Sequence, residues 1–299
     1  MGRRVRQACR RNPRRPDETA GVEAGRAVGV SREDARDRDR LALPAEVARG
    51  VRRRWPERGN VWCESVCGEM TDLCRRQRFR PVEVMSARYG FVLSVEAAEG
   101  RRLVVKSTPD PGGGFQAVAA QQLAVLGIGP AVHEVWESET GAWTVMDQIR
   151  PGTPSIRSPL PALVAVLRPL VAGRQSNAAF PPVSAWLRDR LHHGDELDLP
   201  TGRSVATREE RDHALAILDE LVTDERRTLC HGDMSSGNVL SGPAGLMLID
   251  PRAVSGDVEY DAAVLALKAG HSVAELVRLL GADVERAEAW ASIAIAARV

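Results

Sequence analysis

The stretch CHGDMSSGNVLSGPAGLMLID, residues 230–250, places two short apolar runs on either side of a loop rich in polar residues and glycine. The loop carries Asp233 and Asn238, and the second apolar run ends at Asp250. A hairpin of two short strands would bring the Asn238 amide oxygen and the Asp250 carboxylate to the same end. Two such hard oxygen ligands, completed by water and phosphate oxygens, suit Mg²⁺. Asp233 is then left to accept or orient the proton of an attacking hydroxyl group.

The composition is that of a globular chain that can bury a large core, since 43% of its 299 residues are hydrophobic. No apolar run approaches the roughly 18 residues that span a bilayer, and no secretory signal follows the arginine-rich start. We therefore expect a cytoplasmic monomer with no membrane partner. Cys63, Cys67 and Cys74 share one helical stripe without a usual zinc spacing, which favours core thiols over a metal site or a disulfide.

Residues 1–40 differ from the rest of the chain. They carry twelve arginines against seven acidic residues and almost no large apolar side chain. Such a segment cannot offset the entropy of ordering by burial, so we expect a disordered, arginine-rich tail. A nucleic-acid-binding arm is the alternative, but the segment lacks aromatic residues and its second half alternates in charge sign. We expect no nucleic-acid partner. A further alternative is that the start of the coding sequence is mis-assigned, so that this segment is not part of the native protein.

From Leu41 onward the pattern is periodic, and strands come first and helices second. This order favours an α+β protein of two lobes, with an antiparallel-sheet N-lobe over 41–150 and a mainly helical C-lobe over 151–299. The expected elements are a helix around 47–55, a three-stranded meander within 82–107, a helix over 115–126, strands over 131–138 and 142–149, helices over 161–172, 183–193 and 208–223, and the hairpin 239–241 with 246–249.

Lysine is rare in this chain, because only Lys106 and Lys268 among the 41 basic residues are lysine. A lysine that persists where arginine is the usual cation indicates a need for a compact point charge. Lys106 ends an expected strand, where it could reach a ligand or, as such residues more commonly do, solvent. The polar loop 230–250 favours the ligand.

These residues together carry a resemblance. His231-Gly232-Asp233, four residues, Asn238 and then Ile249-Asp250 resemble the catalytic loop and metal strand of the protein-kinase-like fold, with a strand lysine upstream. The HGD form is similar to aminoglycoside phosphotransferases and their relatives, and residues 249–263 further resemble the subgroup of streptomycin and hydroxyurea phosphotransferases. Turn formers and caps are the structural alternative. The order of lysine, aspartate, asparagine and aspartate favours a phosphotransfer site.

The resemblance implies an ATP- and Mg²⁺-dependent small-molecule kinase that moves the γ-phosphate to a hydroxyl of an antibiotic, such as a streptomycin-like aminoglycoside or hydroxyurea, and so inactivates it. It implies that Lys106 holds nucleotide phosphates, that Asp233 acts on the substrate hydroxyl, and that Asn238 and Asp250 hold Mg²⁺. Further residues have implied supporting roles: His231 braces the loop, Asp257 and Asp261 support it from a helix start, Gly90 lies in the loop over the phosphates, and Met146, Asp147 and Gln148 meet adenine at the hinge.

Two departures from the pattern keep a second function open. The loop over the phosphates, SARYGF, keeps only Gly90, and the helix over 115–126 offers Gln116, Gln121 and Gln122 where protein kinases pair the lysine with a glutamate. An amide can bond an ammonium but cannot neutralise it. The alternative is therefore a degenerate relative that binds nucleotide or ligand without turnover.

The acceptor is the least defined part of the sequence-based prediction. A polycationic aminoglycoside needs clustered carboxylates, because unpaired ammonium groups are costly to desolvate. The candidate cluster is Asp195, Glu196 and Asp198, joined by Asp257, Asp283 and Glu285. A solvated turn between helices is the alternative for residues 195–198.

Overall fold

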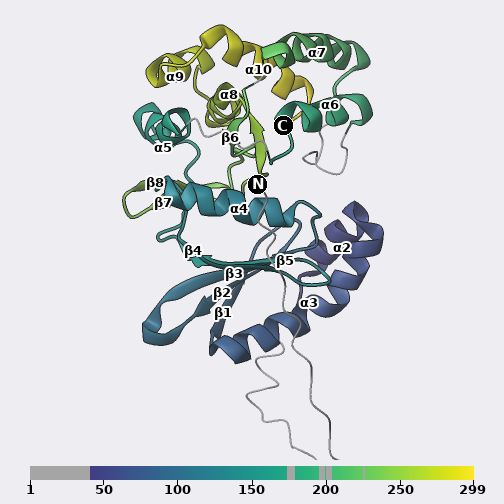
Figure 1. The fold of residues 1–299 in the computed structure, drawn as a ribbon, viewed down its shortest axis with the longest axis vertical. Helices are drawn as coiled ribbons and strands as arrows, with labels where there is room; N and C mark the ends of the chain where they lie inside the picture. Colours follow the sequence, from purple (N-terminus) through teal and green to yellow (C-terminus); the bar gives the residue numbers. More distant parts are fainter. Residues whose placement is uncertain (1–40, 174–178, 195–198, 200–203, 225) are drawn as a thin grey trace, which may run out of the picture.

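The computed structural model describes residues 41–173, 179–194, 199, 204–224 and 226–299. The expected tail over 1–40 and the acidic residues 195, 196 and 198 lie outside the described residues. Figure 1 shows two lobes, a sheet lobe and a helical lobe, with helix α4 between them. The predicted α+β architecture is confirmed.

The N-lobe is built on one five-stranded antiparallel sheet with the order β1-β2-β3-β5-β4. The meander predicted within 82–107 is present, and β3 pairs with both β2 and β5, so that Lys106 lies opposite Val92 and Thr144. The strands are β1 (Arg80–Met85), β2 (Phe91–Glu96), β3 (Arg102–Thr108), β4 (Val132–Glu137) and β5 (Ala142–Asp147), with a 3₁₀ turn η1 (Ala98–Gly100) between β2 and β3.

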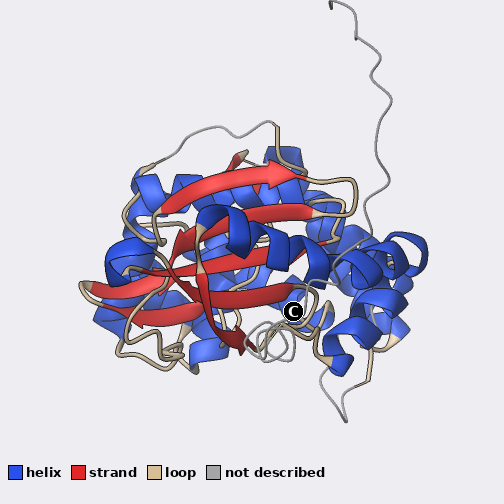
Figure 2. Cartoon of the chain, turned by 90° about the horizontal axis from the view of Figure 1, so that it is seen from below, coloured by secondary structure: helices blue, strands red, loops and turns tan. Residues whose placement is uncertain are grey.

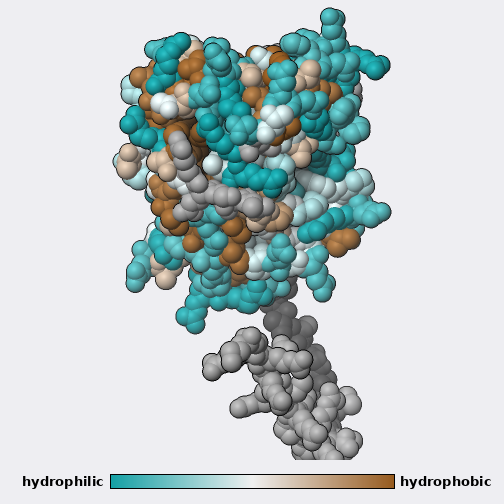
Figure 3. Space-filling model, turned by 45° about the horizontal axis from the view of Figure 1, so that its top comes forward, coloured by the Kyte–Doolittle hydropathy of each residue, from teal (hydrophilic) through white to brown (hydrophobic). Residues whose placement is uncertain are grey.

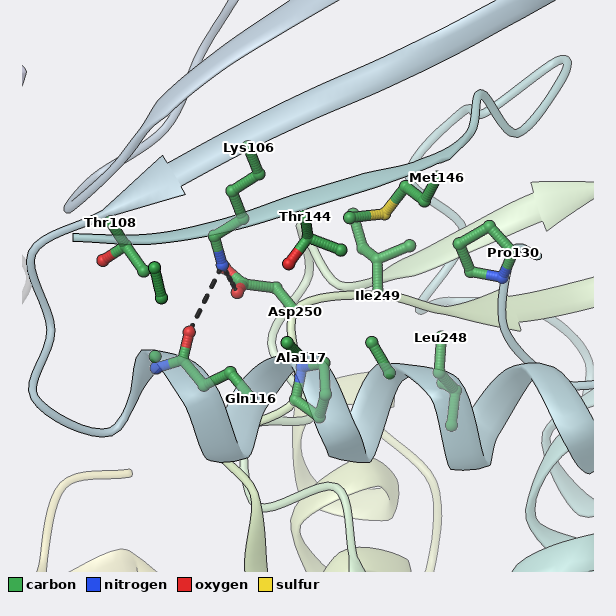
Figure 4. Close-up of a pocket in the computed structure, with 14 residues that line it drawn as sticks. Lys106, Thr108, Gln116, Ala117, Pro130, Thr144, Met146, Leu248, Ile249 and Asp250 are labelled. Atoms are coloured by element: carbon green, nitrogen blue, oxygen red, sulfur yellow. Dashed lines mark hydrogen bonds and ion pairs between the residues drawn. The ribbon is translucent and has the colours of Figure 1, made fainter. Parts of the chain in front are cut away.

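The two faces of this sheet have different partners because side chains alternate along a strand. Leu103 and Val105 of β3 are buried in a core with Trp62 of helix α3 (Pro56–Gln77), which follows α2 (Ala45–Arg54). Trp62 also donates from Nε1 to Oγ of Ser107 at 3.0 Å. Lys106 points from the other face toward α4 (Gly113–Val125) and the C-lobe (Figure 4).

Helix α3 explains the cysteine stripe. Cys74 is buried, while Cys63 and Cys67 are half-buried against the N-lobe core, and all three are free thiols. Burial raises the pKa of Cys63 and of Cys67. The spacing of the cysteines predicted the stripe but not the length of this 22-residue helix.

Helix α4 packs against β4 and β5 of the N-lobe, but part of it belongs to the C-lobe core. Ala119 and Leu123 are buried together with side chains of the C-lobe helices, as is Ile128 after the helix. The backbone N–H of Leu248 donates to the Ile128 oxygen at 2.6 Å. A boundary at residue 150 therefore separates the two lobes along the chain, but residues on its N-terminal side also pack in the core of the C-lobe.

The C-lobe is a layer of helices around α8, whose residues from Val258 to Ala266 are all buried. Two short antiparallel pairs, β6 with β9 and β7 with β8, lie on its side facing the N-lobe. In the described part of the lobe the elements are α5 (Leu160–Ala172), α6 (Val183–His193), α7 (Arg208–Leu221), η3 (Val222–Asp224), β6 (Thr228–Cys230), β7 (Val239–Gly242), β8 (Gly245–Leu248), β9 (Val254–Gly256), α8 (Val258–Ala269), α9 (Val273–Leu280) and α10 (Val284–Ala296).

Figure 2 shows the strands gathered together with helices around them. The face in Figure 3 is mainly hydrophilic, with hydrophobic residues interspersed. Within the described part of the chain, no helix is both long and apolar enough to cross a membrane.

Candidate active site

The loop 231–238 runs from β6 to β7 and is held by helix α8. Gly232 has φ +77°, and a Cβ there would lie 2.6 Å from Cγ2 of Val254, so a larger residue does not fit. The buried carboxylate of Asp261 accepts hydrogen bonds from the backbone N–H groups of His231 (2.6 Å) and Gly232 (2.9 Å). Burial raises the pKa of Asp261, although these two backbone donors act in the opposite direction. Asp261 thus fixes the loop backbone.

The imidazole of buried His231 is occupied on both sides by backbone groups. Its Nε2 lies 2.9 Å from the Ile249 oxygen, and its Nδ1 lies 3.2 Å from the Asp233 nitrogen. A carbonyl oxygen only accepts, so Nε2 carries the proton and Nδ1 accepts from the Asp233 N–H. The ring ties the loop to the end of β8.

Asp233 and Asn238 are joined to each other within the loop. The Asn238 Nδ2 donates to Oδ2 and to the backbone oxygen of Asp233, both at 3.1 Å. Asp233 is half-buried, and its Oδ1 has no hydrogen-bond partner among the residues that the structure describes. With its nitrogen engaged, the Asn238 amide has its oxygen as the free end.

The β7–β8 hairpin brings Asn238 beside Asp250, as the sequence predicts. Val239 pairs with Leu248, and the Ile249 N–H donates to the Asn238 backbone oxygen at 3.0 Å. Asp250 follows directly, with φ +56° in the left-handed region, a conformation that aspartate tolerates better than most residues. Strained backbone of this kind occurs often at functional sites.

Lys106 reaches across from β3 and forms an ion pair with Asp250, which joins the two lobes at this point (Figure 4). Partial desolvation of Asp250, whose side chain stays 48% exposed, is the largest single influence and acts to raise its pKa. The charge and hydrogen bond of Lys106, together with the nearby Arg252, outweigh this influence and hold the pKa of Asp250 below its usual value. The carboxylate is therefore ionised at neutral pH.

A small cavity of about 30 Å³, room for about one water molecule, lies between α4, the sheet and the segment that ends at Asp250. Met146, Thr144 and Leu248 line it together with Lys106 and Gln116 (Figure 4). Of the three predicted hinge residues, Met146 is the one that lines this cavity.

The other two hinge residues are engaged within the sheet. The backbone N–H of Asp147 donates to the Ala131 oxygen at 2.9 Å, and that of Gln148 donates to the Arg102 oxygen at 3.1 Å. The side chain of Gln148 accepts from Ser94 at 3.0 Å. Hydrogen bonds to adenine would have to come from other backbone groups of this segment.

Gly90 lies where the β1–β2 loop meets the end of β3. A Cβ at this position would lie 2.9 Å from the Ser107 backbone oxygen and 3.7 Å from Cε of Lys106. The hydroxyl of Thr108 donates to the Tyr89 oxygen at 3.1 Å. Gly90 is thus required for the close approach of this loop to the Lys106 strand.

Asp257 belongs to a different cluster. It is fully buried and accepts from Nε of Arg286 (2.6 Å), Nε1 of Trp290 (2.9 Å) and the backbone N–H of Arg226 (3.0 Å). Asp283 accepts from the Arg286 backbone N–H at the start of α10. The expectation that Asp257 joins an acceptor-binding cluster is therefore wrong, because its buried carboxylate is used in helix packing.

One residue of this site was missed in the sequence. Asp110, in the turn before α4, accepts a hydrogen bond from Nε2 of Gln116 at 2.9 Å. The Asp-Pro-Gly run at 110–112 marks a turn and a helix start, but not this contact.

The two-lobed fold, with this site between its lobes, defines the class of kinase-like small-molecule phosphotransferases. The model of the phosphotransferase enzyme family matches residues 92–295, and the chain belongs to that family. No curated protein matches the sequence at a significant level.

Several solved structures share the fold at low sequence identity. A choline/ethanolamine kinase family protein from Mesorhizobium loti has a TM-score of 0.56 at 20% identity, over 77% of this chain and 84% of that one. The choline kinase LicA from Streptococcus pneumoniae has a TM-score of 0.54 at 14% identity, over 74% and 85%. The aminoglycoside phosphotransferase APH(3'')-Id from Streptomyces rimosus, in complex with ADP and streptomycin, has a TM-score of 0.51 at 16% identity, over 77% and 97%.

Proposed function

We propose that the protein is an ATP- and Mg²⁺-dependent kinase that transfers the γ-phosphate to a hydroxyl group of a small molecule. The observation that carries this proposal is the meeting of Lys106, Asp250, Asn238 and Asp233 at the junction of the lobes, with Lys106 paired to Asp250 and Asn238 bonded to Asp233. In this proposal residues 41–150 form the nucleotide-binding lobe, and residues 151–299 carry the catalytic loop and the acceptor site.

The residues at the hairpin end fit a magnesium ion. The Asn238 amide oxygen and the Asp250 carboxylate are hard ligands on neighbouring positions, and Asp250 is ionised at neutral pH. Among the described residues there is no group of three or more His, Cys, Asp or Glu side chains that could hold a metal. Phosphate oxygens and water would complete a Mg²⁺ site here, as is usual for this ion. When bound, the ion would neutralise charge on the phosphates.

Asp233 would act on the acceptor. Its Oδ2 is held by Asn238, which leaves Oδ1 to accept the hydrogen bond of the acceptor hydroxyl. In the reaction the hydroxyl oxygen bonds to the γ-phosphorus, the bond from that phosphorus to the β–γ bridging oxygen breaks, and ADP leaves with that oxygen. The hydroxyl proton goes to Asp233. Lys106 would hold the nucleotide phosphates, and Met146 would lie near adenine.

For the acceptor we propose an antibiotic, with a streptomycin-like guanidino-sugar first and hydroxyurea second. The support is the resemblance of residues 249–263 to that subgroup, together with the shared fold of the streptomycin-bound phosphotransferase. Phosphorylation of a hydroxyl would inactivate such a compound.

The test is phosphate transfer from γ-labelled ATP to streptomycin, kanamycin, hydroxyurea and simple sugars, at moderate and high salt, with Asp233→Asn as the inactive control. Transfer to streptomycin that weakens as salt rises would support an acidic acceptor pocket, because exposed charges are screened within about 10 Å at 0.1 M salt. Transfer only to an uncharged acceptor would overturn the aminoglycoside assignment. MgATP binding without transfer to any acceptor would favour the binding-only alternative.

A further inference from the structure

The partner of Lys106 on α4 is an amide. Oε1 of Gln116 lies 3.4 Å from Nζ of Lys106 (Figure 4). An amide oxygen carries only a partial charge, so by itself it orients an ammonium more weakly than a carboxylate does. The rest of the Gln116 side chain shows how this difference is compensated.

A carboxylate stands behind the amide. Oδ2 of Asp110 accepts from Nε2 of Gln116 at 2.9 Å, while Oδ1 accepts from the backbone N–H of Gly112 at 2.7 Å. The backbone N–H of Asp110 donates to Oγ1 of Thr108 at 3.2 Å, and the backbone oxygen of Asp110 accepts from the N–H of Gly113 at 2.8 Å. Asp110 is therefore fixed in position by backbone contacts on both sides.

The two groups that flank Gln116, the Asp110 carboxylate and the Lys106 ammonium, allow only one orientation of its amide. An ionised carboxylate only accepts and a lysine ammonium only donates. With Asp110 at one end and Lys106 at the other, only one orientation of the Gln116 amide satisfies both, with its nitrogen toward Asp110 and its oxygen toward Lys106. Asp110 thus decides which atom of Gln116 faces the lysine.

We propose that Asp110 and Gln116 form a two-residue relay that positions Lys106 for nucleotide phosphates, in place of the single helix glutamate of protein kinases. The relay rests on the phosphate-binding role proposed for Lys106. Asp110 is a positioning residue, because it acts on Lys106 through Gln116. The charge that the α4 sequence lacks is supplied by the turn before the helix.

Asp110→Asn separates the relay from the helix cap. Asparagine keeps Oδ1 for the Gly112 N–H, but replaces Oδ2 with a donor. The Gln116 amide would then turn its oxygen toward this new donor and its NH₂ toward Lys106, where the two donors repel. In the double variant Asp110→Asn/Gln116→Glu the amide and the carboxylate exchange places, so an oxygen, now that of a carboxylate, faces Lys106 again.

Two measurements test the relay. The first is KM for MgATP, with kcat measured alongside. The second is the acylation of Lys106 by a limiting active ester of acetate, read by mass spectrometry against exposed Lys268, the only other lysine of the chain. A Lys106 side chain that has lost its oxygen partner on α4 is held less firmly, so it should react faster with the ester.

For Asp110→Asn we expect KM for MgATP to rise about tenfold with a smaller change in kcat, and the Lys106:Lys268 acylation ratio to rise about threefold, because the oxygen partner of Lys106 on α4 is lost. The double variant should return both to within about twofold of wild type, since exchanged partners restore a coupled pair. Asp283→Asn, the same change at the start of α10, should leave both values unchanged.

Wild-type values in Asp110→Asn, or a double variant no better than Asp110→Asn, would overturn the relay. Failure of the wild-type protein to bind MgATP would instead overturn the proposed function, and the acylation ratio would still decide whether Asp110 acts on Lys106. If Asp110→Asn fails to fold, the double variant still tests the relay. A folded double variant with the wild-type Lys106:Lys268 acylation ratio would support it, because the amide and the carboxylate have then exchanged positions without loss.

Discussion

Asp233 is anchored on one side and open on the other. Asn238 holds its Oδ2 and its backbone oxygen, so the orientation of Asn238 does not depend on the carboxylate alone. The chemistry of Asp233 and the ligand role proposed for Asn238 can therefore be separated by mutation.

Replacing Asp233 with alanine should lower kcat by about 10²-fold or more and leave MgATP affinity nearly intact, because loss of a general base acts in the transition state. The backbone bond to Asn238 remains in this variant. Steady-state kinetics with titration calorimetry provide the check, and unchanged turnover would contradict the role of Asp233.

Asp250 is the proposed carboxylate ligand of the metal, and Asn238 is the neutral one. A site with one carboxylate has no replacement ligand, so Asp250→Ala should abolish the Mg²⁺-dependent part of ATP binding. Calorimetry with and without EDTA measures that part. Equal MgATP affinity in the variant and the wild type would exclude Asp250 as a ligand.

The lowered pKa of Asp250 also has a pH signature. A carboxyl whose folded pKa is depressed adds stability above its unfolded value of 3.8, and this stability is lost as pH falls through the folded pKa. The difference in Tm between wild type and Asp250→Asn should therefore be constant from about pH 8 to about pH 5 and shrink below about pH 4. A difference that already disappears near pH 6 would show that the ion pair with Lys106 does not hold the carboxylate charged.

Among the elements, α2 and α3 lie outside the part matched by the family model, yet they contact the loop that ends at Gly90. The rings of Trp55 and Tyr89 lie 5.6 Å apart, edge to face, and a Cβ on Gly50 of α2 would lie 3.2 Å from the Arg88 oxygen. The helix pair thus supports the outer side of the loop expected to cover the phosphates.

The packing of this pair can be tested with two glycines of α3. A Cβ at Gly59 would lie 2.8 Å from the Val51 backbone oxygen, whereas a Cβ at Gly68 would meet nothing within 4 Å. Gly59→Ala should destabilise by about 1–3 kcal/mol through overpacking. Gly68→Ala should stabilise by about 0.5–1 kcal/mol through helix propensity. Thermal or urea unfolding measures both, and equal effects at the two positions would contradict the close α2–α3 contact.

For the whole molecule, α4 joins the lobes. Leu123 is buried in the C-lobe core, while the same helix contacts β4 and β5 and carries Gln116 to Lys106. A helix shared in this way couples the two cores, which are otherwise built from separate sets of side chains.

We therefore expect the lobes to unfold together. Leu123→Ala, a change at a fully buried position, should cost about 2–5 kcal/mol and lower one common transition. Far-UV circular dichroism and tryptophan fluorescence should follow the same curve, because Trp62 and Trp143 report the N-lobe and Trp290 the C-lobe. Two separated transitions would show that α4 does not couple the lobes.

Local patterns in the sequence predicted the elements that bear the site. The hairpin around 242–245 and the strand that ends near Lys106 follow from period-two alternation and turn residues, and so does the proximity of Asn238 to Asp250. The extent of α3 was not predicted, because its polar and small residues weaken the helical period. The role given to Asp257 in acceptor binding was wrong, because a carboxylate in the sequence does not reveal whether it will be buried beside an arginine.

The sequence by itself determined the strand-then-helix order and the local geometry of the loop 231–250, since hairpins and glycine turns depend on residues near one another in the chain. The tertiary structure alone decided which distant groups meet. It brought Lys106 to Asp250, placed Asp261 under the loop, made α4 part of both lobes and set Asp110 behind Gln116. Three of these contacts span lobes or distant helices, and the fourth depends on how a turn folds back on a helix. None is fixed by spacing along the chain, because each requires the packed cores that hold its two partners.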